Sequence, residues 1–412
     1  MSLTIVTVLH SPDALGGTER TAHLAAASLR KAGHRVCLLH NLEQQPRDAK
    51  EYDESMGVEA FFDTRSLVRR RRHDDAERMV SEFLQQCRAD VVHIHAYPRT
   101  EHINRLANQY PTVVTVHVPL CPNGSRYLWK PRCVCNRNVG SSCFTQGYLR
   151  DGCGKLGNGV PMSKQAFARA MYEDSRLRRA LEACAGINVP SRWMADRLTA
   201  DGFDAARMHV VSPPISEDSQ PKQPCSPPVV LFVGRLVEMK GGADLIAASA
   251  RISTPHQVWI AGAGPEREAL EKQAIDLKVS GHVKFLGSQF PQQLSSLRAA
   301  ACVAVVPSLW PETFGMTGPE AMVAGLPVVA YRAGAVPEWL NDGVTGCLVE
   351  PGNVSALASA IEKILVQQQT GDRMGAAARQ VAKTWSLDRH VEKLLEVYVD
   401  AQSMVAGNIS RN

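Results

Sequence analysis

Long hydrophobic runs are absent from this sequence. No stretch of 18 consecutive apolar residues occurs in its 412 residues, so we expect no transmembrane helix. The first nine residues have neither a basic segment nor a cleavage site, and we interpret them as a first strand rather than a secretion signal. A strong charge is also absent, because the formal net charge is only +5. That balance permits an acidic substrate or an anionic membrane surface but requires neither.

A complete dinucleotide-binding motif is missing too. Val258–Pro265 predicts a strand and then a glycine-rich turn, but Glu266–Ala269 lacks the sixth-position glycine. No acidic residue ends the following strand at Val283–Phe285, so a nicotinamide cofactor is disfavoured. The sequence also lacks a convincing Asp-x-Asp motif for a catalytic metal.

The cysteine count is odd, with eleven in a chain that shows no secretion signal. This favours a reducing compartment and mostly free thiols. We therefore expect a cytoplasmic protein, either free or peripheral at the inner membrane face. At 412 residues, with 44% apolar and 21% charged residues, the chain is expected to form two soluble globular domains.

The first residues indicate a parallel sheet. A strand at Ile5–Leu9 is followed by a helical pattern from Thr21 to Lys31 and a second strand at Val36–Leu39. Gly16 and Gly17 lie at the carboxyl end of the first strand, where open α/β sheets bind ligands. The glycine pair either lets the backbone approach a ligand closely or forms an ordinary tight turn.

Two later strands end in histidine, at Asp90–His95 and Thr112–His117. Because the carboxyl ends of parallel strands share one edge of a sheet, these side chains are expected at the same ligand-binding edge. His117 is either a ligand-binding residue or a satisfied loop histidine. Arg69–Arg72 form a run of four arginines, which is either a solvated face or a patch for an anionic lipid or an acceptor diphosphate.

Residues 119–161 have neither a helical nor a strand period, and they contain five of the eleven cysteines: Cys121, Cys133, Cys135, Cys143 and Cys153. Long irregular segments are usually functional or disordered. Four thiolates make a structural zinc site, although the Cys133-x-Cys135 spacing is not that of a usual zinc knuckle. A zinc site, scattered free thiols and a disulfide are the three alternatives for these cysteines. This segment is our candidate for acceptor recognition.

The pattern restarts after a proline-rich stretch at residues 212–228, which has the composition of an interdomain linker. Val229–Val233 is a strand, and Arg235 and Lys240 stand in the turn that leads to the next helix. A guanidinium and an ammonium there clamp a diphosphate or are two solvated cations.

The most informative stretch follows the apolar run Val303–Val306, a buried strand. A loop containing Glu312 and Gly315 leads to a helix start near Thr317, with Glu320 in its first turn. Free backbone N–H groups at a helix start suit a phosphate, and carboxylates accept bonds from sugar hydroxyls. Together these groups describe a site for a sugar nucleotide.

Seven residues separate Glu312 from Glu320, among them Phe314 and Gly315, and Glu320 begins the tripeptide Glu-Ala-Met. This pattern resembles the signature of family-four retaining glycosyltransferases (glycosyl transferases group 1). The segment from Gly234 to Gly241 is similar to the Gly-Arg-Leu…Lys-Gly motif of the same family. A cysteine-bearing insert after the histidine resembles a subset of that family. One departure is Val118, where the family often has an acid after the histidine. That substitution puts in doubt any role for a carboxylate at this point.

The resemblance implies a GT-B fold, in which two Rossmann-like α/β domains face each other across a cleft. It divides the chain into an acceptor-binding domain at 1–211 that carries the insert at about 119–161, a linker at 212–228, a nucleotide-sugar-binding domain at 229–384, and a terminal helix at 385–412 that crosses back to the first domain.

The activity implied is transfer of a sugar from a nucleotide diphosphate sugar, with retention and without a metal. UDP is the expected nucleotide on family frequency, and the acceptor is a glycan, a lipid-linked or a small molecule. No nucleic-acid partner is expected. The catalytic residues implied are His117, Arg235, Lys240 and Glu312. The donor-binding residues implied are Gly16, Gly17, Arg235, Lys240, Glu312, Phe314, Gly315, Met316, Thr317 and Glu320. A nucleotide-sugar epimerase and a decayed sugar-nucleotide-binding protein are the alternatives.

Overall fold

The structure is a computed structural model that describes residues 2–9, 17–41, 59–62, 80–95, 100–130, 133–156, 160–216, 220–223 and 226–409. Gly16 and the arginine run Arg69–Arg72 lie outside the described residues. Contacts divide the chain into two compact units. Unit 1 contains residues 1–118, 172–214 and 387–412, and unit 2 contains residues 119–171 and 215–386.

Unit 1 is built on a seven-stranded parallel sheet with the order β3-β2-β1-β4-β5-β8-β9. Its strands are β1 (Thr4–Leu9), β2 (Arg35–Asn41), β3 (Glu59–Phe62), β4 (Val91–Ile94), β5 (Thr112–Thr115), β8 (Gly186–Val189) and β9 (Met208–Val210). In β4, β5 and β8 every residue is buried. That burial explains why these strands are short apolar runs rather than alternating patterns.

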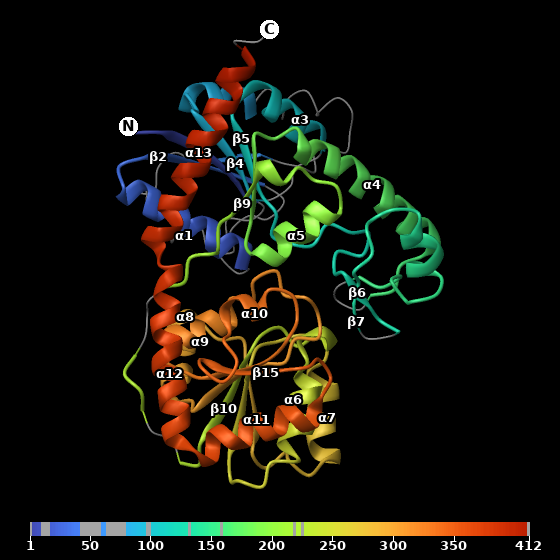
Figure 1. Ribbon diagram of the computed structural model, residues 1–412, viewed down its shortest axis with the longest axis vertical. Coiled ribbons are helices and arrows are strands. Elements are labelled where there is room, and N and C mark those ends of the chain that lie inside the picture. The colour runs from blue at the N-terminus through green and yellow to red at the C-terminus, as the bar shows by residue number, and fades with distance from the viewer. Residues whose placement is uncertain are drawn as a thin grey trace. The chain divides into compact units, whose positions relative to one another are not determined.

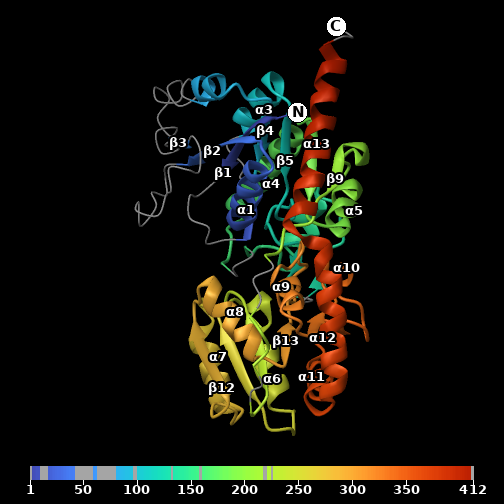
Figure 2. The ribbon, with the colours of Figure 1, turned by 90° about the vertical axis from the view of Figure 1, so that its left-hand side faces the viewer.

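Helices α1 (Gly17–Lys31) and α13 (Leu387–Ile409) supply side chains to one buried cluster of unit 1. That cluster joins Ala25 and Leu29 of α1 to Leu394 and Tyr398 of α13. Figures 1 and 2 show the two helices running beside each other. The last helix of the chain therefore completes the core that the first helix begins. Unit 1 also contains α3 (Thr100–Gln109), α5 (Arg192–Ala200), the last part of α4 (Lys164–Glu182) and a helical segment at residues 80–87.

Unit 2 is built on a six-stranded parallel sheet with the order β12-β11-β10-β13-β14-β15. Its strands are β10 (Val229–Val233), β11 (Gln257–Ala261), β12 (Val283–Gly287), β13 (Val303–Val306), β14 (Val328–Tyr331) and β15 (Gly346–Val349). The helices are α6 (Gly242–Ser249), α7 (Arg267–Asp276), α8 (Pro291–Ala300), α9 (Thr317–Val323), α10 (Val336–Trp339), α11 (Val354–Val366) and α12 (Gln368–Ala382).

The central strand β10 of unit 2 is covered on both faces. Val230 and Phe232 belong to one buried cluster, together with residues of α6, α7 and α11. Val229 and Leu231 belong to a second cluster, with residues of α9, α10 and α12. Because successive side chains of a strand point to opposite faces, these two clusters lie on opposite sides of the sheet. A continuous apolar run such as Val229–Val233 is the sequence that this arrangement requires.

The cysteine-rich segment contains a two-stranded antiparallel sheet, β6 (Tyr127–Leu128) with β7 (Cys133–Val134), and a π-helical turn at Cys143–Tyr148. Tyr127 and Trp129 belong to the same buried cluster as β10 and α6. The sequence prediction assigned residues 119–161 to the N-terminal domain, whereas contacts group residues 119–171 with unit 2.

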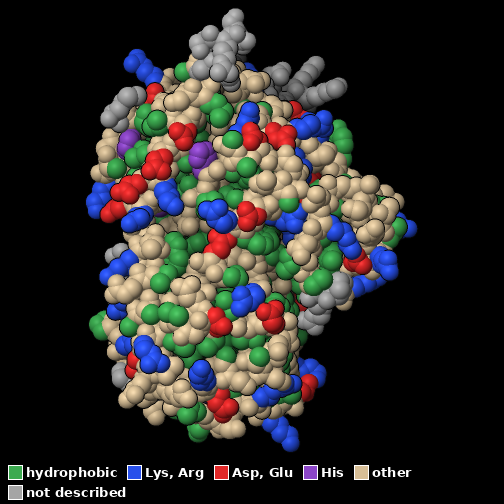
Figure 3. Space-filling view, in the orientation of Figure 1, with side chains coloured by type: hydrophobic (Ala, Val, Ile, Leu, Met, Phe, Trp, Pro, Cys, Tyr) green, Lys and Arg blue, Asp and Glu red, His purple; other side chains and the backbone are tan. Residues whose placement is uncertain are grey.

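The two sheets of parallel strands flanked by helices are the two Rossmann-like α/β domains expected from the sequence. Within the described residues, no helix is both long and apolar enough to cross a bilayer. On the face shown in Figure 3, basic and acidic side chains are interspersed rather than gathered in one patch, as the small net charge suggests.

Candidate active site

A backbone contact in unit 2 joins two loops that leave adjacent strands. The N–H of Leu309, after β13, donates to the carbonyl of Met239, in the turn after β10, at 2.9 Å. Gly241 follows that turn with φ +71°, and a Cβ atom there would lie 1.9 Å from the carbonyl oxygen of Pro307. Only glycine allows both this conformation and this approach. The two loops are thus held together where parallel strands end, which is the edge that binds ligands in open α/β sheets.

This contact brings Lys240 to Glu312. The ammonium nitrogen of Lys240 lies 2.5 Å from Oε1 of Glu312, and the Ser308 hydroxyl donates to the same oxygen at 2.6 Å. Burial alone would raise the pKa of the Glu312 carboxyl, but the charge and hydrogen bond of Lys240 and the bond from Ser308 outweigh it and lower that pKa. Glu312 is therefore a buried, ionised carboxylate with a cation beside it.

The backbone of Glu312 is fixed as well. Its carbonyl accepts a hydrogen bond from the N–H of Ala335 at 2.8 Å. A Cβ atom on Gly334 would lie 2.2 Å from that same carbonyl oxygen, so the loop before α10 lies directly against it. Both the position and the charge of Glu312 are thus set before any ligand binds.

Glu320, in the first turn of α9, forms a buried ion pair with Arg298 of α8. The sequence analysis missed Arg298. A signal was present, because a single arginine interrupts the small and apolar residues 297–306 that lead into β13. The carboxylate predicted to hold ribose hydroxyls therefore already has a guanidinium beside it.

The start of α9 differs in detail from the predicted anion site. The helix begins at Thr317 after Met316, with no side-chain cap. The N–H of Gly318 donates to the carbonyl of Gly315 at 3.1 Å, and Pro319 has no N–H to offer. The Gly318 N–H is therefore occupied within the loop. Phe314 is buried, and its carbonyl accepts a bond from the indole of Trp339 at 2.6 Å.

Arg235 is the exposed cation of the group. It follows β10 and makes no ion pair with any residue that the structure describes. The flanking backbone is anchored to the loop after β11, because Leu236 N–H donates to the Ala263 carbonyl at 2.9 Å. Unit 2 therefore presents a free guanidinium in the same loop as Lys240, and two buried carboxylates each paired with a cation.

Unit 1 places His117 directly after β5, half-buried and in contact with His95. Nδ1 of His95 lies 3.1 Å from Nε2 of His117. Burial lowers the pKa of His117 to about 4, with a smaller contribution from His390. Gly17 is exposed at the start of α1.

Family models match both parts of the chain. "Glycosyl transferase 4-like domain" matches residues 16–214, and "Glycosyl transferases group 1" matches residues 216–381. The chain belongs to the group 1 glycosyl transferases.

Relatives of this glycosyl transferase include two D-inositol 3-phosphate glycosyltransferases. The protein from Corynebacterium diphtheriae is 35% identical over 182 residues, or 42% of either chain. The protein from Geodermatophilus obscurus is 32% identical over 246 residues, or 57% of this chain and 50% of its own. The matched region thus spans half or less of the length of these curated relatives.

Solved structures with the GT-B fold match almost the whole chain. A glycosyltransferase from Rickettsia africae has a TM-score of 0.72 at 17% identity, covering 97% of this chain and 98% of its own. Anabaena HepE, solved with UDP and glucose, has a TM-score of 0.67 at 18% identity, covering 96% of this chain and 98% of its own. These similarities establish the fold of the glycosyl transferase.

The cysteine-rich segment of this glycosyl transferase contains free thiols. Asn123 contacts two of them, accepting from the thiol of Cys121 at 3.1 Å and donating to the sulfur of Cys153 at 3.6 Å. Cys135 and Cys153 are buried, and Cys133 is exposed. In the described part of the chain, no three His, Cys, Asp or Glu side chains are placed to hold a metal ion.

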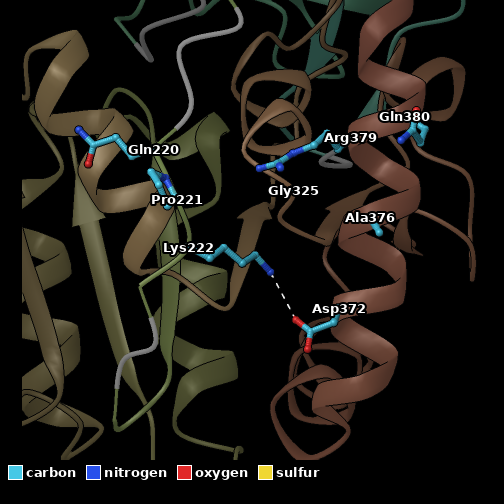
Figure 4. Close-up of a pocket in the computed structure, with 8 residues that line it drawn as sticks. All are labelled: Gln220, Pro221, Lys222, Gly325, Asp372, Ala376, Arg379 and Gln380. Atoms are coloured by element: carbon cyan, nitrogen blue, oxygen red, sulfur yellow. Dashed lines mark hydrogen bonds and ion pairs between the residues drawn. The ribbon is translucent and has the colours of Figure 1, made fainter.

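A hollow of about 570 Å³ lies elsewhere in unit 2 (Figure 4). Linker residue Lys222 and Asp372 of α12 face each other across it at 3.5 Å, and Arg379 also lines it. An adjoining hollow reaches Cys302, directly before β13. These residues lie at the amino ends of the strands, opposite the edge that carries Lys240 and Glu312.

We predict that Arg298→Met lowers the free energy of unfolding by about 3–5 kcal/mol, because it leaves the Glu320 carboxylate buried without its cation. Adding Glu320→Gln should restore part of that loss. Urea unfolding measures the unfolding free energy of the single variant, the double variant and a control. Lys272→Met is the matched control, since its ion pair with Asp276 is 75% and 58% exposed and should contribute about 0–1 kcal/mol. An Arg298→Met loss no larger than the control would contradict the prediction.

A second prediction concerns how the stability of the protein changes with pH. Burial, reinforced by neighbouring histidines, lowers the pKa of His93 to about 3 and of His117 to about 4, and it lowers that of His95 well below 6.5. Burial also lowers the pKa of His390 to about 4. The unfolded chain, with histidines near pKa 6.5, then binds more protons below that pH than the folded chain. Stability should be fully present above pH 6.5 and should fall as the pH is lowered towards 4.

Each histidine contributes a slope of at most about 1.4 kcal/mol per pH unit. Urea unfolding at pH 7.5, 6.5 and 5.5 tests this, and His390→Asn should reduce the slope by removing one of these groups. Equal unfolding free energies at the three pH values would show that these histidines are not buried in the neutral form.

Proposed function

We propose that this protein transfers a sugar from a nucleotide diphosphate sugar to a glycan, a lipid-linked or a small-molecule acceptor, with retention at the anomeric carbon. The observation that carries the proposal is the Lys240–Glu312 pair at the carboxyl ends of β10 and β13, with Arg235 exposed in the same loop. Cations there suit a diphosphate, and an ionised carboxylate beside them suits sugar hydroxyls.

In this proposal, Arg235 and Lys240 stabilise the negative charge that develops on the leaving diphosphate. Preorganised cations are effective in this role because they need no rearrangement when the charge appears. Lys240 meets that condition, since Glu312 holds its ammonium at 2.5 Å. Two cations placed in this way let the reaction proceed without a metal.

In the proposal, the two carboxylates, Glu312 and Glu320, bind sugar hydroxyls. Glu312 receives bonds from Lys240 and Ser308 on Oε1, and in the proposal its Oε2 accepts bonds from hydroxyls of the transferred sugar. Glu320 accepts from the ribose, with Arg298 fixing the direction of its carboxylate. Met316 and Thr317, half-buried where α9 begins, contact the phosphates.

In this proposal, which follows the family resemblance, His117 binds the transferred sugar, and Gly16 and Gly17 bind the donor phosphate. With no protein nucleophile assigned, the acceptor attacks on the face that the diphosphate leaves, through an oxocarbenium-like transition state. The relatives support this reading of the chemistry class, since two are named D-inositol 3-phosphate glycosyltransferases. HepE, a protein of the same fold solved with UDP and glucose, makes UDP the first nucleotide to test.

A thermal-shift panel of UDP, GDP, ADP, TDP and CMP, without and then with magnesium, tests the proposal. A ligand at a hundred times its Kd stabilises the native state by about 2.7 kcal/mol, which such a panel detects. We expect one diphosphate to stabilise the protein without magnesium. No shift with any nucleotide would favour a decayed site. Turnover of the nucleotide sugar without any acceptor would favour an epimerase.

Arg235 gives the sharpest variant. Arg235→Gln should weaken binding of the stabilising diphosphate by about 1.5–3 kcal/mol, the usual cost of losing a charged hydrogen-bond partner. Because the side chain is exposed and has no ion pair among the described residues, the unfolding free energy should change by only about 0.5 kcal/mol. Arg267→Gln, an exposed arginine of the same unit paired with Glu271, should leave binding unchanged. Calorimetric titration of both variants decides the matter, and equal affinities would remove Arg235 from the site.

The zinc prediction for Cys121, Cys133, Cys135, Cys143 and Cys153 stays a prediction. Metal analysis of the purified protein tests it. About one zinc per chain, lost together with thermal stability on chelation, would support a structural site. Metal-free protein of unchanged stability would leave the thiols as buried side chains.

A further inference from the structure

Unit 1 contains a group of three neighbouring histidines, two buried and one half-buried, that the proposed function does not use in full. His93 and His95 come from β4 and its end, and His117 comes from the end of β5. The two strands are neighbours in register, with His93 opposite Val113. Side chains at their carboxyl ends therefore meet at one edge of the sheet. His93 and His95 are both buried.

His95 contacts His117 directly. Nδ1 of His95 lies 3.1 Å from Nε2 of His117, and the two rings stack with centroids 5.3 Å apart and planes 28° apart. The backbone of His95 is held too, because its N–H donates to the carbonyl of Val8 at 3.0 Å. His95 thus lies between the sheet and the histidine assigned to the transferred sugar.

The ring of His95 also packs against the ring of His93, whose centroid lies 4.0 Å away. His93 is fixed at both ring nitrogens, by the Tyr398 hydroxyl at 2.7 Å and the Thr115 hydroxyl at 2.7 Å. A ring bonded at both nitrogens and buried has one orientation. His95 is therefore packed against a rigid partner.

The hydrogen bond between His95 and His117 limits which ring nitrogens can carry protons. Two neutral imidazoles joined by a hydrogen bond need one N–H and one bare nitrogen between them. If Nδ1 of His95 carries the proton, Nε2 of His117 is bare and Nδ1 of His117 carries its proton. If Nε2 of His117 carries the proton, Nδ1 of His117 is bare. Either way, the state of His95 decides whether Nδ1 of His117 donates or accepts.

We propose that His95 is a positioning residue that sets both the ring direction and the protonation pattern of His117. This inference deepens the proposed function and rests on it, because that function gives His117 its contact with the transferred sugar. If Nδ1 of His117 were protonated where it must accept, or bare where it must donate, it could not form a hydrogen bond with the sugar hydroxyl. His95 itself need not touch the substrate.

The test compares two replacements of His95. Asparagine keeps a polar atom near the position of Nδ1, whereas leucine fills a similar volume without one. We expect His95→Leu to lower kcat by about 10- to 100-fold, as misplaced catalytic groups do, with little change in affinity for the stabilising nucleotide. His95→Asn should stay within about threefold of the parent, because it keeps the bond to His117.

The second arm is a double-variant cycle. If His95 acts only through His117, adding His95→Leu to His117→Ala should cause no further loss of kcat. Losses that multiply would overturn the inference while leaving the proposed function intact. Full activity of His117→Ala would remove His117 from the site, and the inference with it.

A structural readout keeps the inference testable even if no transfer activity is found. The imidazole nitrogen chemical shifts of His117, measured on histidine-labelled protein, report which nitrogen carries the proton. We expect one tautomer in the parent and in His95→Asn, and a changed or mixed pattern in His95→Leu. An unchanged pattern in His95→Leu would overturn the inference.

His256→Leu is the matched control. His256 is buried in unit 2 before β11, with bonds to the Ser249 hydroxyl at 2.9 Å and the Thr254 carbonyl at 2.7 Å. Its replacement removes a comparable buried ring without touching His117. It should lower stability and leave kcat unchanged. A similar loss of kcat in this variant would make the His95→Leu effect one of general destabilisation and would overturn the inference.

Discussion

The candidate site depends on one backbone hydrogen bond, from Leu309 to Met239. It fastens the loop after β13 to the turn after β10, and Gly241 permits the close approach that makes the bond possible. Without this contact, Lys240 and Glu312 would be two charges on separate loops. With it, they become a partly buried pair whose geometry is supported by main-chain atoms as well as by the flexible lysine side chain. A side chain held in this way loses little freedom when a ligand binds.

The two glutamates show two solutions to one problem. A buried carboxylate is costly unless a partner compensates for lost water. Glu312 uses a lysine and a serine hydroxyl, and Glu320 uses an arginine from a neighbouring helix. Lysine concentrates its charge on one mobile atom, whereas the planar guanidinium of arginine fixes a carboxylate in direction as well as in charge. In the proposed function, the lysine pairing suits Glu312, which binds the transferred sugar, and the arginine pairing suits Glu320, which binds the ribose.

The sequence predicted the parts of this arrangement that depend on local pattern. The apolar runs Val229–Val233 and Val303–Val306 identified the central strands, since only strands covered on both faces are apolar throughout. Motif order singled out Lys240 and Glu312, which the structure places 2.5 Å apart, and their role as site residues stays a prediction. Arg298 could not be assigned in the same way, because its partner lies 22 residues away on another helix and the pairing depends on how α8 and α9 pack. The same limit applied to the π-helical turn at Cys143–Tyr148 and to the grouping of residues 119–171 with unit 2.

Unit 1 is assembled from both ends of the chain. The hydrogen bond between His93 and Tyr398 joins residues 305 positions apart, and α13 packs against α1. During synthesis, the first sheet must therefore wait until almost the whole chain has been translated before its core is closed. Unit 2, which contains residues 119–171 and 215–386, is complete before α13 is translated. At translation rates of about 5–20 residues per second, the stretch from the end of β9 at Val210 to the end of α13 at Ile409 takes roughly 10 to 40 seconds to make. During that time the uncovered face of the first sheet is a natural substrate for chaperones.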